Sequence, residues 1–268
     1  MSSRRTFVIG DIHGDLAALE AVLARMPRPD ADDTMVFLGD YLDRGPDSAG
    51  VVDFLMNVLP LHTPARLVML RGNHEDAWGK VMDGEWSDFV MPVGNGCLQT
   101  MESFLGESTS PPGTAPTFEQ IERMVAADFF PPSVARWLRE LPHFYEDEHA
   151  IYVHAGLPIT PEGTFVHPSE ATGKQRTALL WIRDHRFFRG YRGKTVVVGH
   201  TGTAALPPEL SDFTPDDPTD LWYGPAVIGI DTGAGKRGFL TALELPGGVV
   251  YESRASDPKL DAAPHHEV

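Results

Sequence analysis

Carboxylate, amide and imidazole side chains occur beside glycine at five places in the first 200 residues of this 268-residue chain. Oxygen and imidazole donors of this kind bind divalent metal ions. The residues of ligand type are Asp11, His13, Asp40, Asn73, His154 and His200. A single residue of this kind beside glycine carries little information, but the repetition indicates a metal site assembled from separate segments.

Each of these places directly follows a short apolar run that predicts a buried strand. The runs are Thr6–Ile9, Met35–Leu38, Leu67–Leu70, Ile151–Val153 and Val196–Val198. Ligands of α/β proteins bind at the loops that follow the carboxyl ends of the strands. We therefore expect two aspartates, one asparagine and three histidines to meet at one edge of a sheet.

The segment Gly39–Ser48 concentrates this chemistry, because it places Asp40, Asp43 and Arg44 between a predicted strand and a predicted helix. A purely structural interpretation is a capping turn, in which Asp47 or its neighbour starts the helix and the glycines permit the bend. That interpretation leaves Asp40, Asp43 and Arg44 unexplained. These three residues therefore need partners elsewhere in the chain.

Five motifs, GDIHGD, GDYLDRG, LRGNHE, HAG and GH, occur in this order between Gly10 and about His200. Together they resemble the phosphoprotein phosphatase family of calcineurin-like metallophosphoesterases, most of all its bacterial and phage serine/threonine phosphatases. The DTGA at Asp231 is also similar to the bacterial members. The resemblance implies an α/β fold in which two mixed β-sheets pack as a sandwich flanked by helices.

The resemblance also implies two divalent metal ions, with Mn²⁺ expected and Fe or Zn as alternatives. Asp11 and His13 would bind the first ion and Asp40 would bridge both. The ligands of the second ion would be Asn73, His154 and His200. Two metal ions of this kind would hold the phosphoryl oxygens and activate a hydroxide. The hydroxide would attack the phosphorus in line, without forming a phospho-enzyme intermediate.

Further residues match the family's catalytic and phosphate-binding positions. His74 matches the general acid that protonates the leaving oxygen, with Asp43 holding its ring; a hydrogen bond within its own loop is the alternative. Arg44 matches an arginine that grips the phosphate through its planar fork. Arg183, in Trp-Ile-Arg, is similar to a second such arginine, and a surface salt bridge is its alternative.

Three neighbouring residues have roles that the motifs leave open. Glu75 caps the next helix or supports the metal ligands. Arg71 contacts phosphate or forms a structural pair. Cys97 stands in a Gly-Asn-Gly-Cys turn where bacterial relatives often have a second glycine after Asn-Gly, which weakens any role assigned to that turn.

The whole chain, 1–268, is expected to form a single metallophosphoesterase domain. Alternating strands and helices up to about residue 81 predict parallel pairing. Residues 79–149 interrupt this alternation and predict a helical insert, which either covers the sheet or selects substrates. The last apolar runs, Val227–Ile230, Phe239–Leu245 and Val249–Tyr251, predict antiparallel strands.

Composition narrows the function further. The chain has 42% hydrophobic and 22% charged residues, as in ordinary globular proteins. Its net charge of −16 disfavours nucleic acid and anionic membranes as partners. The first residues contain no apolar signal-peptide segment, and no stretch is long enough to span a membrane. The one cysteine cannot form an intrachain disulfide, which fits the cytoplasm.

These observations predict a cytoplasmic, metal-dependent phosphomonoester hydrolase, a serine/threonine protein phosphatase acting on phosphorylated proteins or peptides. One rival is a dinucleoside polyphosphate hydrolase on the same scaffold, but the symmetrical tetraphosphate hydrolases typically carry alanine where Asp43 stands. Another is an inactive phosphopeptide-binding module, which would not need the full ligand set together with His74. The sequence gives no indication of oligomeric state.

Overall fold

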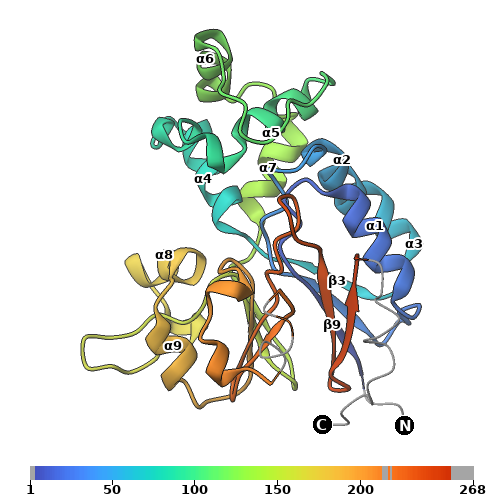
Figure 1. Ribbon diagram of the computed structural model, residues 1–268, viewed down its shortest axis with the longest axis vertical. Coiled ribbons are helices and arrows are strands. Elements are labelled where there is room, and N and C mark those ends of the chain that lie inside the picture. Colours follow the sequence, from blue (N-terminus) through green and yellow to red (C-terminus); the bar gives the residue numbers. More distant parts are fainter. Residues whose placement is uncertain (1–3, 213–216, 218, 255–268) are drawn as a thin grey trace.

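Two five-stranded sheets lie at the centre of the computed structural model, which describes residues 4–212, 217 and 219–254 (Figure 1). The first sheet has the order β10-β9-β1-β2-β3 and the second β4-β5-β6-β8-β7. The strands of the first are β1 (Thr6–Ile9), β2 (Thr34–Phe37), β3 (Arg66–Met69), β9 (Thr241–Leu245) and β10 (Val249–Glu252). Those of the second are β4 (Phe144–Glu146), β5 (Ile151–Val153), β6 (Val196–Val198), β7 (Trp222–Tyr223) and β8 (Val227–Gly229).

The first three strands run parallel, as the alternation of strands and helices predicts. Helix α1 (Leu16–Arg25) joins β1 to β2, and Asp15 caps it by accepting a hydrogen bond from Ala18 N at 3.0 Å. Helix α2 (Ser48–Asp53) begins after Asp47, whose Oδ1 accepts from Gly50 N at 2.8 Å. It continues through a π-helical turn (Phe54–Val58) into α3 (Leu59–His62). The capping interpretation of Asp47 is therefore correct.

The closing strands are antiparallel in the first sheet only. Strand β9 pairs antiparallel with β1, and β10 pairs antiparallel with β9, as expected. The prediction for Val227–Ile230 was wrong in part, because β8 runs parallel to β6 and antiparallel only to the two-residue β7. The connection from β6 to β8 contains the short 3₁₀ turns Thr203–Ala205 and Pro208–Leu210 and no α-helix among its described residues. The sequence therefore shows no helical periodicity from which the parallel direction of β8 could be predicted.

Helices dominate the region between β3 and β4. They are α4 (Asn73–Met82), α5 (Cys97–Phe104), α6 (Phe118–Ala126) and α7 (Pro132–Glu140), with 3₁₀ turns at Ser87–Val90 and Val93–Asn95. The predicted capping box of α6 is present, since Thr117 N donates to Gln120 Oε1 at 2.8 Å and Gln120 N donates to Thr117 Oγ1 at 3.2 Å. Helices α4, α5 and α6 stand together beyond one end of the sheets (Figure 1).

The predicted insert, 79–149, includes more than helices. Its last part contains β4, which is the edge strand of the second sheet. Between β5 and β6 the chain forms a 3₁₀ turn (Pro168–Glu170) followed by α8 (Lys174–Trp181) and α9 (His185–Gly190). Within the described residues, no helix combines the length and apolar character that crossing a membrane requires.

Alternating side chains explain how the sheets pack. From β1, Val8 points into a cluster shared with Tyr152 and Ile228 of the second sheet. Its neighbours Phe7 and Ile9 point the other way, into a cluster covered by helices of the first half. A third cluster covers the outer face of the second sheet with residues of α8 and α9. The two sheets therefore form the predicted sandwich, with helices outside.

Candidate active site

The loops that carry the site hold several residues in unusual backbone conformations. Six non-glycine residues have positive φ in the described part of the chain, and five of them lie in the loops that follow β1, β2 and β6. These five are His13, Asp40, Asp43, Arg44 and His200, with φ between 48° and 73°. Each costs roughly 1–3 kcal/mol, and such residues cluster at functional sites. The packed ends of β1, β2 and β6 therefore hold these side chains in fixed directions.

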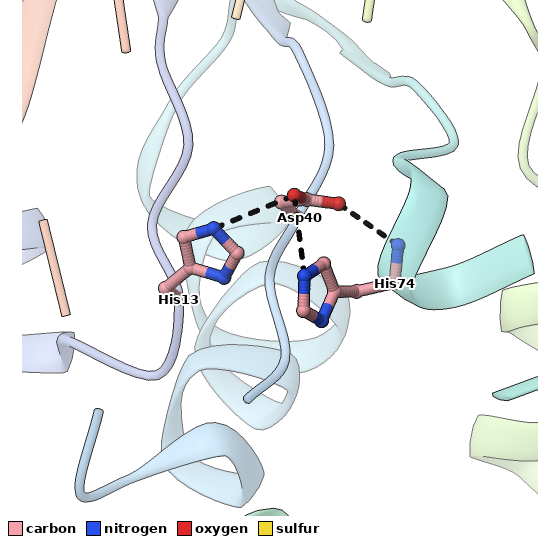
Figure 2. A group of neighbouring side chains, drawn as sticks. All are labelled: His13, Asp40 and His74. Atoms are coloured by element: carbon pink, nitrogen blue, oxygen red, sulfur yellow. Dashed lines mark hydrogen bonds and ion pairs between the residues drawn. The ribbon is translucent and has the colours of Figure 1, made fainter. Parts of the chain in front are cut away.

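Asp40 lies at the centre of the site and is 1% exposed (Figure 2). Its Oδ2 lies 3.4 Å from His13 Nε2, and its Oδ1 lies 3.4 Å from His154 Nε2. The backbone N–H of His74 donates to Oδ1 at 3.0 Å. One carboxylate therefore faces imidazoles that come from both sheets.

Asn73 contacts the two histidines that come from the second sheet. Its Oδ1 lies 2.9 Å from His154 Nε2 and 2.7 Å from His200 Nδ1. Burial, with the nearby His154 and Arg183, lowers the pKa of His200 to about 2, and burial also lowers the pKa of His154. Both rings are therefore neutral at physiological pH and keep a lone pair for a metal ion.

The donor set fits two divalent ions that share one carboxylate. Two groups of ligand atoms, His13–Asp40–His74 and Asp40–His154–His200, each lie within 4.8 Å of one another. His200 Nε2 and Asp11 Oδ1 are buried without a hydrogen-bond partner, which is costly unless a cation occupies the space. Asp11 lies beside these groups, and its Oδ2 accepts from His200 N at 2.9 Å.

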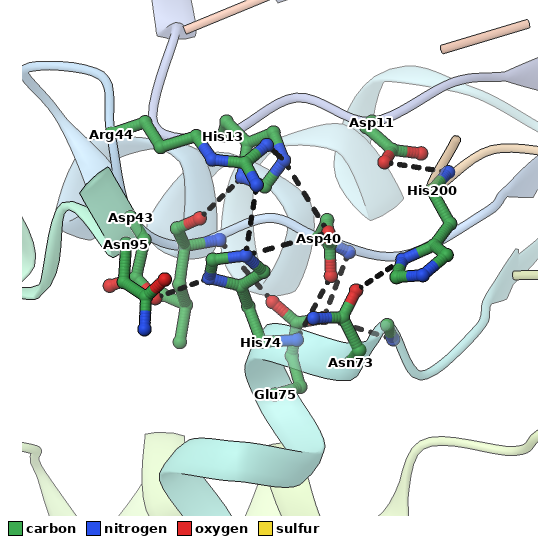
Figure 3. A network of polar contacts seen from close by, with 12 residues as sticks. Asp11, His13, Asp40, Asp43, Arg44, Asn73, His74, Glu75, Asn95 and His200 are labelled. Carbon is green, nitrogen blue, oxygen red and sulfur yellow. Dashed lines mark hydrogen bonds and ion pairs between the residues drawn. The ribbon is translucent and has the colours of Figure 1, made fainter. Parts of the chain in front are cut away.

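His74 and Asp43 form a buried pair next to Asp40 (Figure 3). His74 Nδ1 lies 2.6 Å from Asp43 Oδ2, so its partner belongs to the β2 loop and not to its own loop. The carboxylate also accepts from Trp78 Nε1 at 2.9 Å and from Thr100 Oγ1 at 2.6 Å. Burial would lower the pKa of His74, but the charges of Asp40 and Asp43 outweigh it and raise the pKa. The geometry therefore favours an oriented imidazolium.

Glu75 performs both tasks that the sequence left open. It caps α4 by accepting from Gly72 N at 2.9 Å. It also accepts from Asp40 N at 2.8 Å and from Tyr41 N at 2.9 Å, which fixes the backbone of the central carboxylate. Burial, and then the charge of Asp40, raises its pKa to about 7.

The arginines differ in their surroundings. Arg44 reaches into the site, where its Nη1 contacts His13 and its Nη2 lies 3.3 Å from His74 Nε2. Arg71 donates instead to the backbone oxygen of Arg139 on α7, which is a structural contact. Arg183 is exposed, and across residues 4–212, 217 and 219–254 its side chain has no hydrogen bond or ion pair. The salt-bridge alternative for Arg183 therefore has no partner there.

Sequence reasoning did not identify Trp78 and Thr100, and no motif marks them. The spacing of Trp78 four residues after His74 on α4 is a usable signal, because such residues share a helix face. Asp231, noted only as part of DTGA, is buried near Asp11, and its charge adds to burial in raising the pKa of Asp11. The Cys97 thiol, which stands where bacterial relatives often have glycine, lies 4.0 Å from Asp43 Oδ2. Cys97 therefore packs against the pair of His74 and Asp43.

Comparison with known proteins identifies the family. The calcineurin-like phosphoesterase family matches residues 4–225, and the chain belongs to this family. It is 44% identical over 71 residues to the serine/threonine-protein phosphatase SIT4 of Candida albicans, a stretch covering 25% of this chain and 22% of that protein. The chain matches less than half the length of relatives of this kind.

Solved structures share the fold. One is described as a candidate diadenosine tetraphosphatase, with a TM-score of 0.55, 23% identity and 93% of each chain covered. Another is a protein serine/threonine phosphatase from Saccharomyces cerevisiae, with a TM-score of 0.53, 17% identity, and 95% of this chain and 81% of that chain covered. At these identities the likeness establishes the metallophosphoesterase fold and not the substrate.

Proposed function

We propose that this protein is a metal-dependent serine/threonine protein phosphatase that hydrolyses phosphomonoesters of proteins or peptides. The observation that carries the proposal is the buried pair of His74 and Asp43 at 2.6 Å. A serine or threonine alkoxide is a poor leaving group and needs a strong, well-oriented acid. A nucleoside diphosphate leaves more easily and needs such an acid less.

Two divalent ions, when bound, supply positive charge to the phosphoryl oxygens and make a water molecule acidic enough to attack at neutral pH. We assign Asp11 and His13 to one ion and Asp40 to both. The remaining ligands are Asn73, His154 and His200. The match to the calcineurin-like phosphoesterase family and the clustered aspartate and histidine side chains support this assignment. Mn²⁺ is our proposed ion in vitro, with Fe or Zn as alternatives.

Protein side chains handle the leaving group and the phosphate. His74 holds a proton on the nitrogen that faces Asp40 and gives it to the leaving oxygen, while Asp43 keeps the ring oriented through Nδ1. Arg44 binds phosphoryl oxygens through its guanidinium, because its Nη atoms already lie at the two histidine rings. Arg183 is a second phosphate-binding arginine, since it is exposed and close enough to His200 to affect its pKa.

A dinucleoside polyphosphate hydrolase is the second candidate, favoured by the similar fold of the candidate diadenosine tetraphosphatase. An inactive phosphopeptide-binding module is the third. For the protein as a whole we propose a single catalytic domain in the cytoplasm, with no nucleic-acid or membrane partner, and a helical insert at 79–149 beside the site. The acidic composition supports the absence of nucleic-acid and membrane partners.

Initial rates with Mn²⁺ on phosphoserine and phosphothreonine peptides and on diadenosine tetraphosphate separate the candidates. We expect the higher kcat/KM on peptides, and Asp43→Ala should narrow the gap by harming the peptide reaction more. A parent enzyme that cleaves the dinucleotide more efficiently than every phosphopeptide would move the function to nucleotides. Peptide binding without any turnover, in protein that holds its metals, would indicate the binding module.

A further inference from the structure

A cavity of about 500 Å³ opens beside the candidate active site. Its polar lining includes Arg44, Gln99, Lys236 and Arg237, and its apolar lining includes Val93 and Pro112. Because Arg44 also contacts His13 and His74, the cavity and the catalytic centre share one wall. A substrate whose phosphate lies on Arg44 would therefore extend into this cavity.

The walls of the cavity are built tightly against the catalytic loops. Gly96 has φ +81°, and a Cβ placed there would lie 2.1 Å from Arg44 N. Gly235 has φ +71°, and a Cβ there would lie 2.3 Å from the backbone oxygen of His13. Only glycine permits both approaches. The segment carrying Lys236 and Arg237 is thus fixed to the loop that follows β1.

Two cations of this cavity make no direct contact with an anionic group in the described part of the chain. In the described ranges, neither Lys236 nor Arg237 has a side-chain hydrogen bond or ion pair, and no acidic residue lines the cavity. Partial burial lowers the pKa of Lys236, and the positive charges of Arg44 and Arg183 lower it further. The negative charges of Asp231 and Asp40 oppose this effect only in part. Cations gathered in this way in a protein of net charge −16 provide a local positive field for an anion.

We propose that the cavity binds a second anionic group of the substrate, and that the enzyme selects phosphopeptides with an acidic or phosphorylated residue next to the scissile phosphate. The inference rests on the proposed function. Arg44 and Lys236 line the same cavity. A carboxylate or phosphate one or two residues from the scissile phosphate, at most about 7 Å away along an extended peptide, would therefore face Lys236 when the scissile phosphate lies on Arg44. Val93 and Pro112 of the same lining offer apolar contact to the peptide.

Two matched phosphothreonine peptides test the inference. One carries alanine and the other carries glutamate at the two positions before and the two positions after the phosphothreonine. The enzymes are the parent, Lys236→Gln, Arg237→Gln and the charge-matched control Arg28→Gln, an exposed residue on the loop that precedes β2. We expect the parent to have the lower KM on the acidic peptide. Each cavity variant should raise that KM roughly threefold to fivefold, the upper part of the range of exposed ion pairs, with little change in kcat.

The alanine peptide and the control variant should show no such change. Peptide turnover with equal KM on both peptides, or a KM increase in Lys236→Gln no larger than in Arg28→Gln, overturns the cavity proposal and leaves the phosphatase proposal standing. Turnover of diadenosine tetraphosphate without peptide turnover overturns the phosphatase proposal. In that case, a raised dinucleotide KM in Lys236→Gln assigns the second anion to the polyphosphate chain, and an unchanged one overturns the cavity proposal as well.

Discussion

The indole nitrogen of Trp78 donates a hydrogen bond to Asp43 Oδ1 at 2.9 Å, and so links helix α4 to the carboxylate that orients His74 on the same helix. Thr100 of α5 donates to the same oxygen at 2.6 Å. The candidate general acid is therefore held by a carboxylate whose own position depends on two helices, α4 and α5.

Trp78→Phe keeps the aromatic packing on Phe129 and Phe130 but leaves the buried Asp43 with one donor fewer. We expect the free energy of unfolding to fall by about 1–3 kcal/mol, measured by urea denaturation. Trp137→Phe is the control, because that indole packs on Tyr41 and forms no hydrogen bond among the described residues. Equal losses in the two variants would argue against the role of the indole N–H.

His74→Asn should retain bound metal, while turnover of alkyl phosphates falls by roughly 10²–10⁴, the usual contribution of a positioned acid. The loss should be smaller for aryl phosphates, whose leaving groups need less protonation. Metal content and the kcat of both substrate types are measured on the same preparation. Equal losses on both would remove His74 from the role of general acid.

Asp40→Asn should weaken both metal positions at once, because this carboxylate faces His13 and His154 on opposite sides. We expect metal content to fall, and the rise in Tm that Mn²⁺ gives the chelator-treated parent to shrink, since a ligand bound only by the folded state stabilises it. Asp32→Asn, exposed at the opposite end of β2, is the control. A variant that holds two ions with normal turnover would exclude the bridging role.

His143 should make stability depend on pH. Partial burial, with the charges of Arg71 and Arg176, lowers its pKa to about 4. Between about pH 6.5 and 4 the unfolded chain therefore binds this proton more readily, so the stability contributed by neutral His143 is complete above pH 6.5 and is lost as the pH falls.

Comparing His143→Gln with the parent at pH 7.5 and pH 5 isolates this effect. The unfolding constant of the parent should rise more on acidification, by roughly tenfold after allowance for partial exposure. His62→Gln, exposed on α3, controls for the loss of a histidine. Parallel pH profiles in the parent and His143→Gln would contradict the prediction.

Sequence patterns were sufficient for the parts of the molecule that are encoded locally. Each apolar run and the polar residue after it lie within a few positions, so both the strand and the candidate ligand at its end can be predicted together. The cap at Asp47 and the capping box at Thr117 are local for the same reason. Parallel pairing of β1, β2 and β3 followed from the helices between them.

What the sequence could not provide depends on contacts between distant segments. Thr100 reaches Asp43 across 57 positions, and no periodicity in α5 distinguishes it from any other helical threonine. The direction of β8 depends on a crossover without a regular α-helix. The cavity beside Arg44 needs Lys236 placed against the loop after β1, which only the folded chain brings about.

The bond from His200 N to Asp11 Oδ2 joins residues 189 positions apart, and it connects the two sheets at the proposed metal ligands. Neither sheet alone presents the complete donor set, because Asp11, Asp40 and Asn73 follow strands of the first sheet while His154 and His200 follow strands of the second. A nascent chain therefore has no complete hydrolytic centre until its second half has folded onto the first. Metal bound at the proposed ligands would therefore require both sheets to be packed together, and it would raise the free energy needed to separate them.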